Sequence, residues 1–401
     1  MTNQSFLSFV LVAILLSTSA EQATAESKWR QVEIDKIKIG YGIAIADVDG
    51  DAKPDIVLAD KSTVQWYRNP SWTKHVIAQD LTERDNVCVA ARDIDGDGKC
   101  EIAIGGQWNY RESVKDGAVH YLVAPEDRTQ PWTPVKLHHE PSTHRMHWVR
   151  AAKNDYRLVV KPLRGKGSRD GDGAGLKLLA YSRPGDPTST WKHDVVCDFM
   201  HLSHNFHLVN WDDDVDEEMI IAGKEGVWHL DRQGDQWKRS QLTAAFAGEV
   251  RDGRLPRGDG ADGQGSEMIK AKRFVTTIQP MHGSTSAVYV EPEQSGQPWE
   301  LVKVLDESLK DGHAIACADF LGRGSDQIIV GWRAMNEKGI PGIKLFTPLD
   351  ADGKRWQEEQ LSADKIAIED IKAGDLNGDG KVDFVAAARQ TKNLVIFFNE
   401  N

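Results

Sequence analysis

Cysteine is scarce in this 401-residue chain, which contains only Cys88, Cys100, Cys197 and Cys317. Their spacing matches no zinc-binding motif, so a cysteine-held zinc site is excluded. Cys88 and Cys317 fall in expected inner strands, where we predict buried free thiols, although an exported chain would permit disulfides. The sequence also lacks the strand-to-helix serine motif of the nucleophile elbow, so it gives no support for a serine hydrolase of that type.

Positive charge is in deficit as well. The chain has 49 Lys and Arg residues against 61 Asp and Glu residues, a formal net charge of -12. Residues 1–25 contain one charged residue, Glu21, so the remainder would carry -11. Nucleic-acid binding needs a basic surface. The composition therefore predicts no nucleic-acid partner.

Long apolar runs are limited to one, Phe6–Leu16, which is too short to span a bilayer comfortably. Small residues follow it at Ala23–Ala25, as in a signal-peptide cleavage site. We therefore expect a secretory signal at 1–25, no membrane span, and a secreted or periplasmic protein with one domain at 26–401.

An acidic pattern recurs along the chain. The runs are Asp47–Asp55, Asp93–Glu101, Asn210–Glu218 and Asp375–Asp383, with a degenerate fifth starting at Asp319. Oxygen-bearing side chains at positions 1, 3, 5 and 9 suit a hard cation such as Ca²⁺. The predicted structural calcium ligands are Asp47, Asp49, Asp51, Asp55, Asp93, Asp95, Asp97, Glu101, Asn210, Asp212, Asp214, Glu218, Asp375, Asn377, Asp379 and Asp383.

Short apolar stretches flank these runs, for example Ile43–Ala46 before the first and Ile56–Leu58 after it. Each run is therefore expected in the turn of a β-hairpin, and the pattern differs from an EF-hand, which needs two flanking helices. Because the repetition demands one role for all the runs, they are poor candidates for paired catalytic carboxylates.

The spacing of the runs predicts the fold. From position 47 to position 375, six steps of roughly 55 residues fit the range of propeller blades. Two units without the acidic pattern are expected at His147–Ala152 with Leu158–Val160, and at Gly265–Ile269 with Arg273–Ile278. The sequence thus predicts an all-β, seven-bladed β-propeller with Ca-type hairpin loops, in which Trp29–Ile34 completes the last blade.

Histidines recur at the expected starts of the innermost strands. His204 and His313 stand six residues before position 1 of their runs, and His147 fits the same place in a unit without the run. The innermost strands of a propeller line a central channel, and their starts share one end, or mouth, of it. His282 lies in a turn expected at the same mouth. A single such histidine is most often a core residue, but several at one mouth could bind a divalent transition metal or act as general acid and base. The predicted catalytic residues are His147, His204, His282 and His313.

Basic and aromatic side chains are expected near the same mouth. The predicted substrate-binding residues are Tyr41, Arg164, Lys224, Arg251, Trp332 and Arg333. Such side chains suit a sugar or an acidic sugar, and the alternative for each one is a solvated position at the rim.

The acidic runs resemble the FG-GAP/VCBS repeats of integrin-type propellers. Three further segments, Gly248–Leu255, Ile278–Gly283 and Asp311–Ala316, resemble the propeller domain of the aldos-2-ulose dehydratase family. That resemblance implies β-elimination from a keto-sugar, in which a base removes a proton next to a carbonyl and an electrophile stabilises the enolate.

Two hypotheses follow. The first is a secreted lyase or dehydratase acting on a keto-sugar or an acidic sugar at the histidine-rich mouth. The second is a non-catalytic, calcium-stabilised propeller that binds a glycan or a protein. The first predicts that His147, His204 and His313 lie within reach of one ion, about 2.0–2.1 Å each for Zn²⁺.

Overall fold

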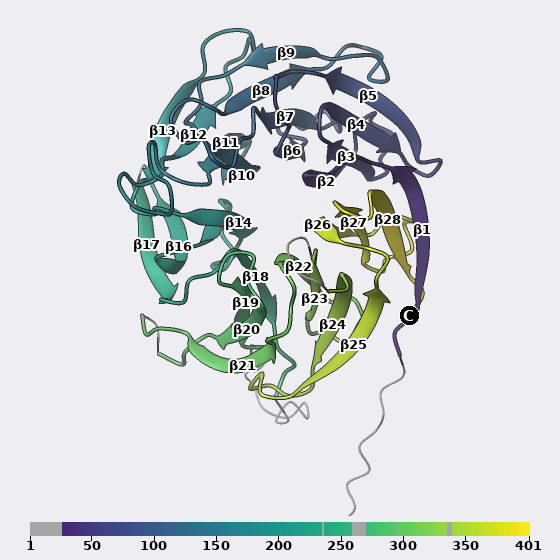
Figure 1. The fold of residues 1–401 in the computed structure, drawn as a ribbon, viewed down its shortest axis with the longest axis vertical. Coiled ribbons are helices and arrows are strands. Elements are labelled where there is room, and N and C mark those ends of the chain that lie inside the picture. Colours follow the sequence, from purple (N-terminus) through teal and green to yellow (C-terminus); the bar gives the residue numbers. More distant parts are fainter. Residues whose placement is uncertain (1–25, 235, 259–269, 295, 335–338) are drawn as a thin grey trace, which may run out of the picture.

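A computed structural model describes residues 26–234, 236–258, 270–294, 296–334 and 339–401. In these ranges the chain forms 28 β-strands, arranged as seven antiparallel four-stranded sheets (Figure 1). Neighbouring inner strands contact one another round the ring, and β26 closes it against β2. The predicted all-β, seven-bladed propeller is therefore confirmed. Among the same residues, no helix is both long and apolar enough to cross a bilayer.

Each sheet is a blade whose strands follow one another outward from the channel. Blades 1 to 4 consist of β2 (Gly42–Ala46), β3 (Asp55–Ala59), β4 (Thr63–Arg68) and β5 (Thr73–Gln79); β6 (Cys88–Arg92), β7 (Glu101–Gly106), β8 (Ala118–Val123) and β9 (Thr133–Lys136); β10 (Thr143–Ala152), β11 (Asp155–Pro162), β12 (Leu178–Ser182) and β13 (Lys192–Cys197); β14 (Ser203–Val209), β15 (Glu218–Gly223), β16 (Gly226–Gln233) and β17 (Gln236–Thr243).

Blades 5 to 7 follow the same order, except that the outermost strand of blade 7 comes from the start of the described chain. They consist of β18 (Glu249–Arg254), β19 (Arg273–Gln279), β20 (Thr285–Val290) and β21 (Glu300–Asp306); β22 (Gly312–Ala318), β23 (Gln327–Trp332), β24 (Gly342–Pro348) and β25 (Trp356–Ala363); β26 (Ile368–Gly374), β27 (Asp383–Ala388), β28 (Asn393–Asn399) and β1 (Trp29–Lys36).

Strand β1 closes the ring, as the sequence predicted. It pairs antiparallel with β28, from Trp29 opposite Asn399 to Lys36 opposite Asn393. The Trp29 ring packs edge-on against Phe384, with ring centroids 5.0 Å apart. This pairing covers an edge of blade 7 that would otherwise expose unpaired backbone groups.

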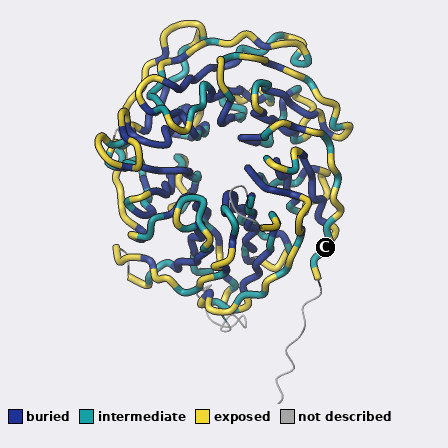
Figure 2. The backbone as a smooth tube through the Cα atoms, viewed as in Figure 1, coloured by how far each residue is buried: buried dark blue, intermediate teal, exposed yellow. Residues whose placement is uncertain are grey.

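The core lies between the blades. Every residue of β7, β15 and β27 is buried, because adjacent blades cover both faces of these strands. The outermost strands are more exposed, as Figure 2 shows at the rim of the ring. The four cysteines form no disulfide; Cys88 is a buried free thiol, as predicted, whereas Cys317 is a free thiol that is only half-buried.

Three of the acidic turns, those starting at Asp47, Asp93 and Asp375, share one set of hydrogen bonds. In the turn starting at Asn210, only Glu218 at position 9 keeps its equivalent bond, accepting the N–H of Trp211 at 2.8 Å. In the first turn, the Asp47 carboxylate accepts the backbone N–H groups of Gly50 and Ala52, both at 2.7 Å. Asp55 Oδ2 accepts the N–H of Val48 at 2.8 Å. Gly50 has φ 83°, a conformation that glycine adopts without strain. The position-1 and position-9 side chains therefore act as turn caps within the hairpin.

The degenerate turn shows that these bonds need no carboxylate at position 9. Asp319 accepts the N–H groups of Arg323 and Gly324, and the Gln327 amide oxygen accepts the N–H of Leu321 at 2.8 Å. A neutral amide thus replaces the last acid of the pattern while the hairpin keeps its shape.

One expected inner strand was misplaced. Gly265–Ile269, predicted to begin blade 5, lies outside the described residues, and the inner strand is β18, Glu249–Arg254. Its sequence has charged residues at four of six positions, so it lacks the apolar pattern of a buried strand. Charged side chains fit there because the strand lines the channel.

Candidate functional site

Irregular strand pairing places the key side chains. In β10, β14, β22 and β26 the pairing register shifts just after the first residue. The residues at these shifts are His144, His204, His313 and Glu369. A bulge inserts one unpaired residue and re-aims its side chain, and bulges gather at functional rims. Four blades thus use the same device at the same end of the channel.

Three imidazoles form the histidine group, which we define as His204, His282 and His313. One ring nitrogen from each lies within 4.8 Å of the others. His204 Nε2 and His282 Nε2 are 2.9 Å apart, and the ring centroids of His204 and His313 are 4.9 Å apart. These three predicted catalytic residues are brought together as the sequence suggested.

A tight turn presents His282. The turn follows β19 and is closed by a hydrogen bond from the N–H of Gly283 to the carbonyl of Pro280 at 2.8 Å. His282 itself has φ 57°, a left-handed conformation that is uncommon outside glycine. Such backbone conformations persist where the surrounding structure holds them, often at functional sites.

In His204 and His313, the two fully buried histidines of the group, the ring nitrogen Nδ1 faces a fixed hydrogen-bond acceptor. His204 Nδ1 lies 2.6 Å from Glu249 Oε1, and His313 Nδ1 lies 2.6 Å from the carbonyl oxygen of Glu369. Both contacts require the proton on Nδ1, because a neutral imidazole carries one N–H. His204 and His313 therefore present bare Nε2 atoms. An imidazole whose other nitrogen donates to a carboxylate or carbonyl is the usual arrangement of a metal ligand.

Burial keeps these rings neutral. Desolvation lowers the pKa of His204, His282 and His313 well below the usual value of 6.5, and the nearby Arg145 and Arg333 charges lower the pKa further. His204 and His313 are neutral imidazoles with bare Nε2 atoms, which suit a divalent transition metal such as Zn²⁺. The contacts of His282 with Arg333 and His204 favour its proton on Nε2, and this proton would have to leave that nitrogen for His282 to join them. The donor set therefore fits such an ion.

Arg333 anchors the histidine group from one side. Its guanidinium donates to Asp311 at 2.9 and 3.1 Å and to Glu369 Oε2 at 2.8 Å. Burial alone would lower the pKa of Arg333, but the Glu369 and Asp311 carboxylates raise it. Arg333 Nη2 also lies 3.3 Å from His282 Nδ1. The predicted residue Arg333 thus lies in the site and holds its acidic partners in place.

The expected position of His147 was wrong by three residues. Strand register makes His144, opposite the end of β11, the counterpart of His204, whereas His147 is the counterpart of His207. His147 is not among the three histidines of the group. Blade 3, which contains His144 and His147, has no acidic turn from which to count residues. The sequence alone therefore did not determine the register of its inner strand, β10.

His144 is a site residue that the sequence did not single out. Its ring stacks on Trp108, with centroids 4.8 Å apart, and meets the His204 ring edge-on at 4.6 Å. Its Nδ1 lies 3.3 Å from an Arg145 guanidinium nitrogen, so this contact favours the proton on Nε2. Nε2 is buried and has no hydrogen-bond partner among the described residues. It is a donor available to a ligand.

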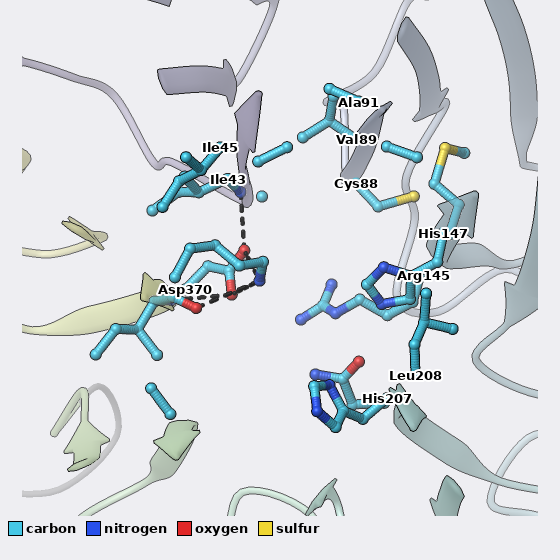
Figure 3. A pocket seen from close by; sticks show the side chains of 18 of the residues that line it. Ile43, Ile45, Cys88, Val89, Ala91, Arg145, His147, His207, Leu208 and Asp370 are labelled. Carbon is cyan, nitrogen blue, oxygen red and sulfur yellow. Dashed lines mark hydrogen bonds and ion pairs between the residues drawn. The ribbon is translucent and has the colours of Figure 1, made fainter. Parts of the chain in front are cut away.

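A cavity of about 470 Å³ occupies the channel; its lining includes Arg145 and Asn205, which follow His144 and His204 in the chain, but none of the three histidines of the group. Arg145, His147 and His207 lie on one side of it, across from Asp370 (Figure 3). Burial lowers the pKa of His147 well below its usual value, so that ring is neutral as well. The volume lies in the range of small-molecule sites.

The remaining predicted substrate-binding residues are distributed around the channel. Arg251 lines the cavity, and the Tyr41 hydroxyl donates to Asp85 at 3.0 Å. Trp332 Nε1 donates to the carbonyl of Ile340 at 2.7 Å.

Arg164 and Lys224 bond backbone carbonyls of one loop. Arg164 donates to Arg169 and Lys224 donates to Gly171, the latter at 3.0 Å. These bonds give both residues a structural task, and their predicted contact with substrate stays a prediction.

Two of the acidic turns gather possible cation ligands. Oxygens of Asp47, Asp49 and Asp55 lie within 4.8 Å of one another, as do those of Asp93, Asp95 and Glu101. Both carboxylate oxygens of Asp49 are buried without a hydrogen bond from the described residues, although Arg68 forms an ion pair with one of them. The predicted calcium binding stays a prediction for all four turns.

Comparison with known proteins gives two family matches. The family described as "Aldos-2-ulose dehydratase, beta-propeller domain" matches residues 116–292, and "FG-GAP-like repeat" matches residues 47–104. A curated protein, "Aldos-2-ulose dehydratase" of Phanerodontia chrysosporium, is 26% identical over 355 residues, covering 81% of this chain and 37% of that protein. The chain thus spans little more than a third of the length of this curated relative.

Solved structures share the fold. A structure of BBS1N in complex with ARL6DN is 13% identical with a TM-score of 0.56, covering 94% of this chain and 98% of that one. A chain of the Mitotic Checkpoint Complex is 11% identical with a TM-score of 0.57, and the match covers 100% of both. At such identities the likeness concerns the propeller fold alone.

Proposed function

We propose that this chain is a secreted or periplasmic lyase that performs β-elimination on a keto-sugar or an acidic sugar at the histidine group. The similarity to the propeller of an aldos-2-ulose dehydratase supports this class of substrate and reaction. The apolar run Phe6–Leu16, on which the proposed export rests, lies outside the described residues.

One observation carries the proposal. His204, His282 and His313 come from two inner strands and one turn, yet they converge at one end of the channel with neutral rings. A histidine with a purely structural role in the core does not require two further histidines in contact with it. Three neutral imidazoles suit a divalent transition metal, which, when bound, polarises a substrate oxygen as a Lewis acid.

The other side chains supply binding and proton transfer. His147, neutral and lining the cavity, accepts the proton from the carbon next to the substrate carbonyl or carboxylate. The C–H electrons form a double bond to the adjacent carbon, whose hydroxyl leaves and takes up a proton as water. The His144 Nε2–H donates to a substrate oxygen on which charge develops.

The acidic turns have a separate, structural task in this proposal. Ca²⁺ bound at positions 1, 3, 5 and 9 would stiffen hairpins at the other ends of the inner strands. These turns join the ends of inner strands, whereas His204 and His313 lie at the starts of such strands. The two kinds of site are therefore assigned different metals.

The second candidate is a non-catalytic propeller, stabilised by calcium, that binds a glycan or a protein. The Trp108–His144 stack favours it to the extent that an aromatic surface at a channel mouth suits a sugar ring. It does not account for the carboxylate and carbonyl that orient His204 and His313.

The test is to purify the full chain, measure its metal content and assay turnover. An aldos-2-ulose and a hexuronate would each be incubated with protein loaded with Zn²⁺ or Mn²⁺, and the ultraviolet absorbance of a conjugated carbonyl product would be followed. Metal-dependent absorbance growth is expected with at least one substrate. If the protein bound a sugar tightly but formed no product with either metal, the result would support the non-catalytic, sugar-binding propeller instead.

A further inference from the structure

The channel cavity has cationic side chains on its walls. Those that line it are Arg92, Arg145, Arg251 and Lys372. This is unexpected in a protein whose formal net charge is -12. Charges on a cavity wall are less screened than surface charges, so each one needs a nearby counter-charge.

Two of these cations are neutralised within the wall. Arg92 donates to both carboxylate oxygens of Glu217, at 2.7 and 2.9 Å. Lys372 donates to both oxygens of Asp370, at 2.9 and 3.1 Å. Neither side chain has charge to spare for a ligand.

Arg251 is partly balanced. Its Nη1 lies 3.9 Å from Glu249 Oε2 and donates to its neighbouring carbonyl, that of Val250, at 2.6 Å. Glu249 at the same time holds His204 and accepts the amide of Asn205 at 2.6 Å. This carboxylate therefore serves both the arginine and the histidine group.

Arg145 has no such partner. Its Nη1 contacts the carbonyl of Val87 at 3.4 Å and the carbonyl and Nδ1 of His144 at 3.1 and 3.3 Å. Within the described parts of the chain, no carboxylate oxygen forms an ion pair with it. Arg145 thus points one unneutralised guanidinium into the cavity (Figure 3), and its Nη1 contacts His144, whose ring meets that of His204.

We propose that the channel cavity binds the carboxylate of an acidic sugar, with Arg145 as its charged partner. A planar guanidinium matches a carboxylate through two parallel hydrogen bonds. Arg145 is the one cation of the cavity wall without a carboxylate partner among the described residues, and a singly charged carboxylate would neutralise it. The proposal deepens the proposed function, on which it rests for the view that the ligand is a sugar.

Equilibrium binding tests the proposal without any need for turnover. Calorimetry with the full, metal-loaded chain would compare glucuronate, its methyl ester and glucose, which keep one ring and differ in charge. Glucuronate is expected to bind at least about tenfold more tightly than the ester, because only the acid pairs with Arg145. Equal affinities for acid and ester, or no binding of glucuronate, would overturn the proposal.

Variants of Arg145 test whether this residue forms the carboxylate-binding subsite of the cavity. Arg145→Gln is expected to bring the affinity for glucuronate down to that for the ester, and Arg145→Lys to retain part of the difference. Arg30→Gln, at an exposed pair with Glu400 on the outermost strand, is the matched control and should change neither affinity. An unchanged preference for the acid in a folded Arg145→Gln protein would contradict the assignment.

Two further results would distinguish a carboxylate ligand from a phosphate ligand, and the binding subsite from the lyase activity. Glucose 6-phosphate binding more tightly than glucuronate would contradict the choice of a carboxylate. A protein that prefers glucuronate through Arg145 yet forms no unsaturated product would contradict the lyase and support the subsite.

Discussion

His204 Nε2 lies 2.9 Å from His282 Nε2, although 78 residues separate the two in sequence. His204 begins an inner strand of blade 4, and His282 belongs to the turn between two strands of blade 5. Two imidazole nitrogens this close either share a proton or share an ion. The contact to Glu249 fixes the His204 proton on Nδ1, which leaves its Nε2 free to accept either.

Removing one member of the histidine group should release the transition metal. His282→Ala or His313→Ala is expected to lose bound transition metal while calcium content stays unchanged, because the acidic turns are separate. Elemental analysis of the purified proteins gives both numbers. His207→Ala is the matched control, since His207 lines the same channel outside the group. Metal retained in both group variants would contradict the assignment.

Glu249 should act through His204. Glu249→Gln keeps a hydrogen-bond acceptor but removes the charge that orients His204, and outer partners of this kind typically change metal affinity about 10–100-fold. We expect zinc affinity, measured by competition with a chelator, to fall by that factor while the thermal transition stays cooperative. A folded variant with unchanged zinc affinity would show that Glu249 has a packing role only.

His147 should affect catalysis without holding the metal. In His147→Gln we expect kcat to fall about 10²–10⁴-fold, the usual contribution of a positioned proton acceptor, with metal content unchanged. The KM should change little, because the side chain keeps its polarity. Loss of metal together with activity would instead place His147 among the ligands.

Calcium should stabilise the protein more at pH 8 than at pH 5. Burial raises the pKa of Asp55 and of Glu101 to about 7 from ordinary values of 3.8 and 4.5. The folded apo protein therefore holds protons that the unfolded chain has released, and its stability falls as the pH rises from about 4 to 7. Above pH 7 these carboxylates are charged, and a bound cation offsets the free-energy cost of burying their negative charge.

Thermal melts with calcium and with chelator, at both pH values, measure this difference. Glu101→Gln is the control, because Gln can still accept the Ile94 N–H that Glu101 accepts at 3.1 Å. It should have a smaller calcium response and a weaker dependence on pH. A calcium-induced shift in Tm that is larger at pH 5 would contradict the prediction.

The positions of His204 and His313 could be read from sequence because an acidic turn follows each strand at a fixed distance. His144 could not, because its blade has no acidic turn and a strand bulge leaves no pattern in the residues around it. Glu249 was missed for a related reason. Its strand is rich in charge, so it does not resemble the buried strands on either side.

The sequence by itself determined the number of blades, because the acidic runs recur at a regular spacing. It also determined the shape of most acidic turns, because hydrogen bonds between residues only a few positions apart close them. Only the tertiary structure decided which side chains meet in the channel. Closing the ring brings together residues from Tyr41 to Ala373, and strand register decides whether each one faces the channel. Register depends on pairing across the whole blade, and a shift of one residue turns a side chain to the opposite face.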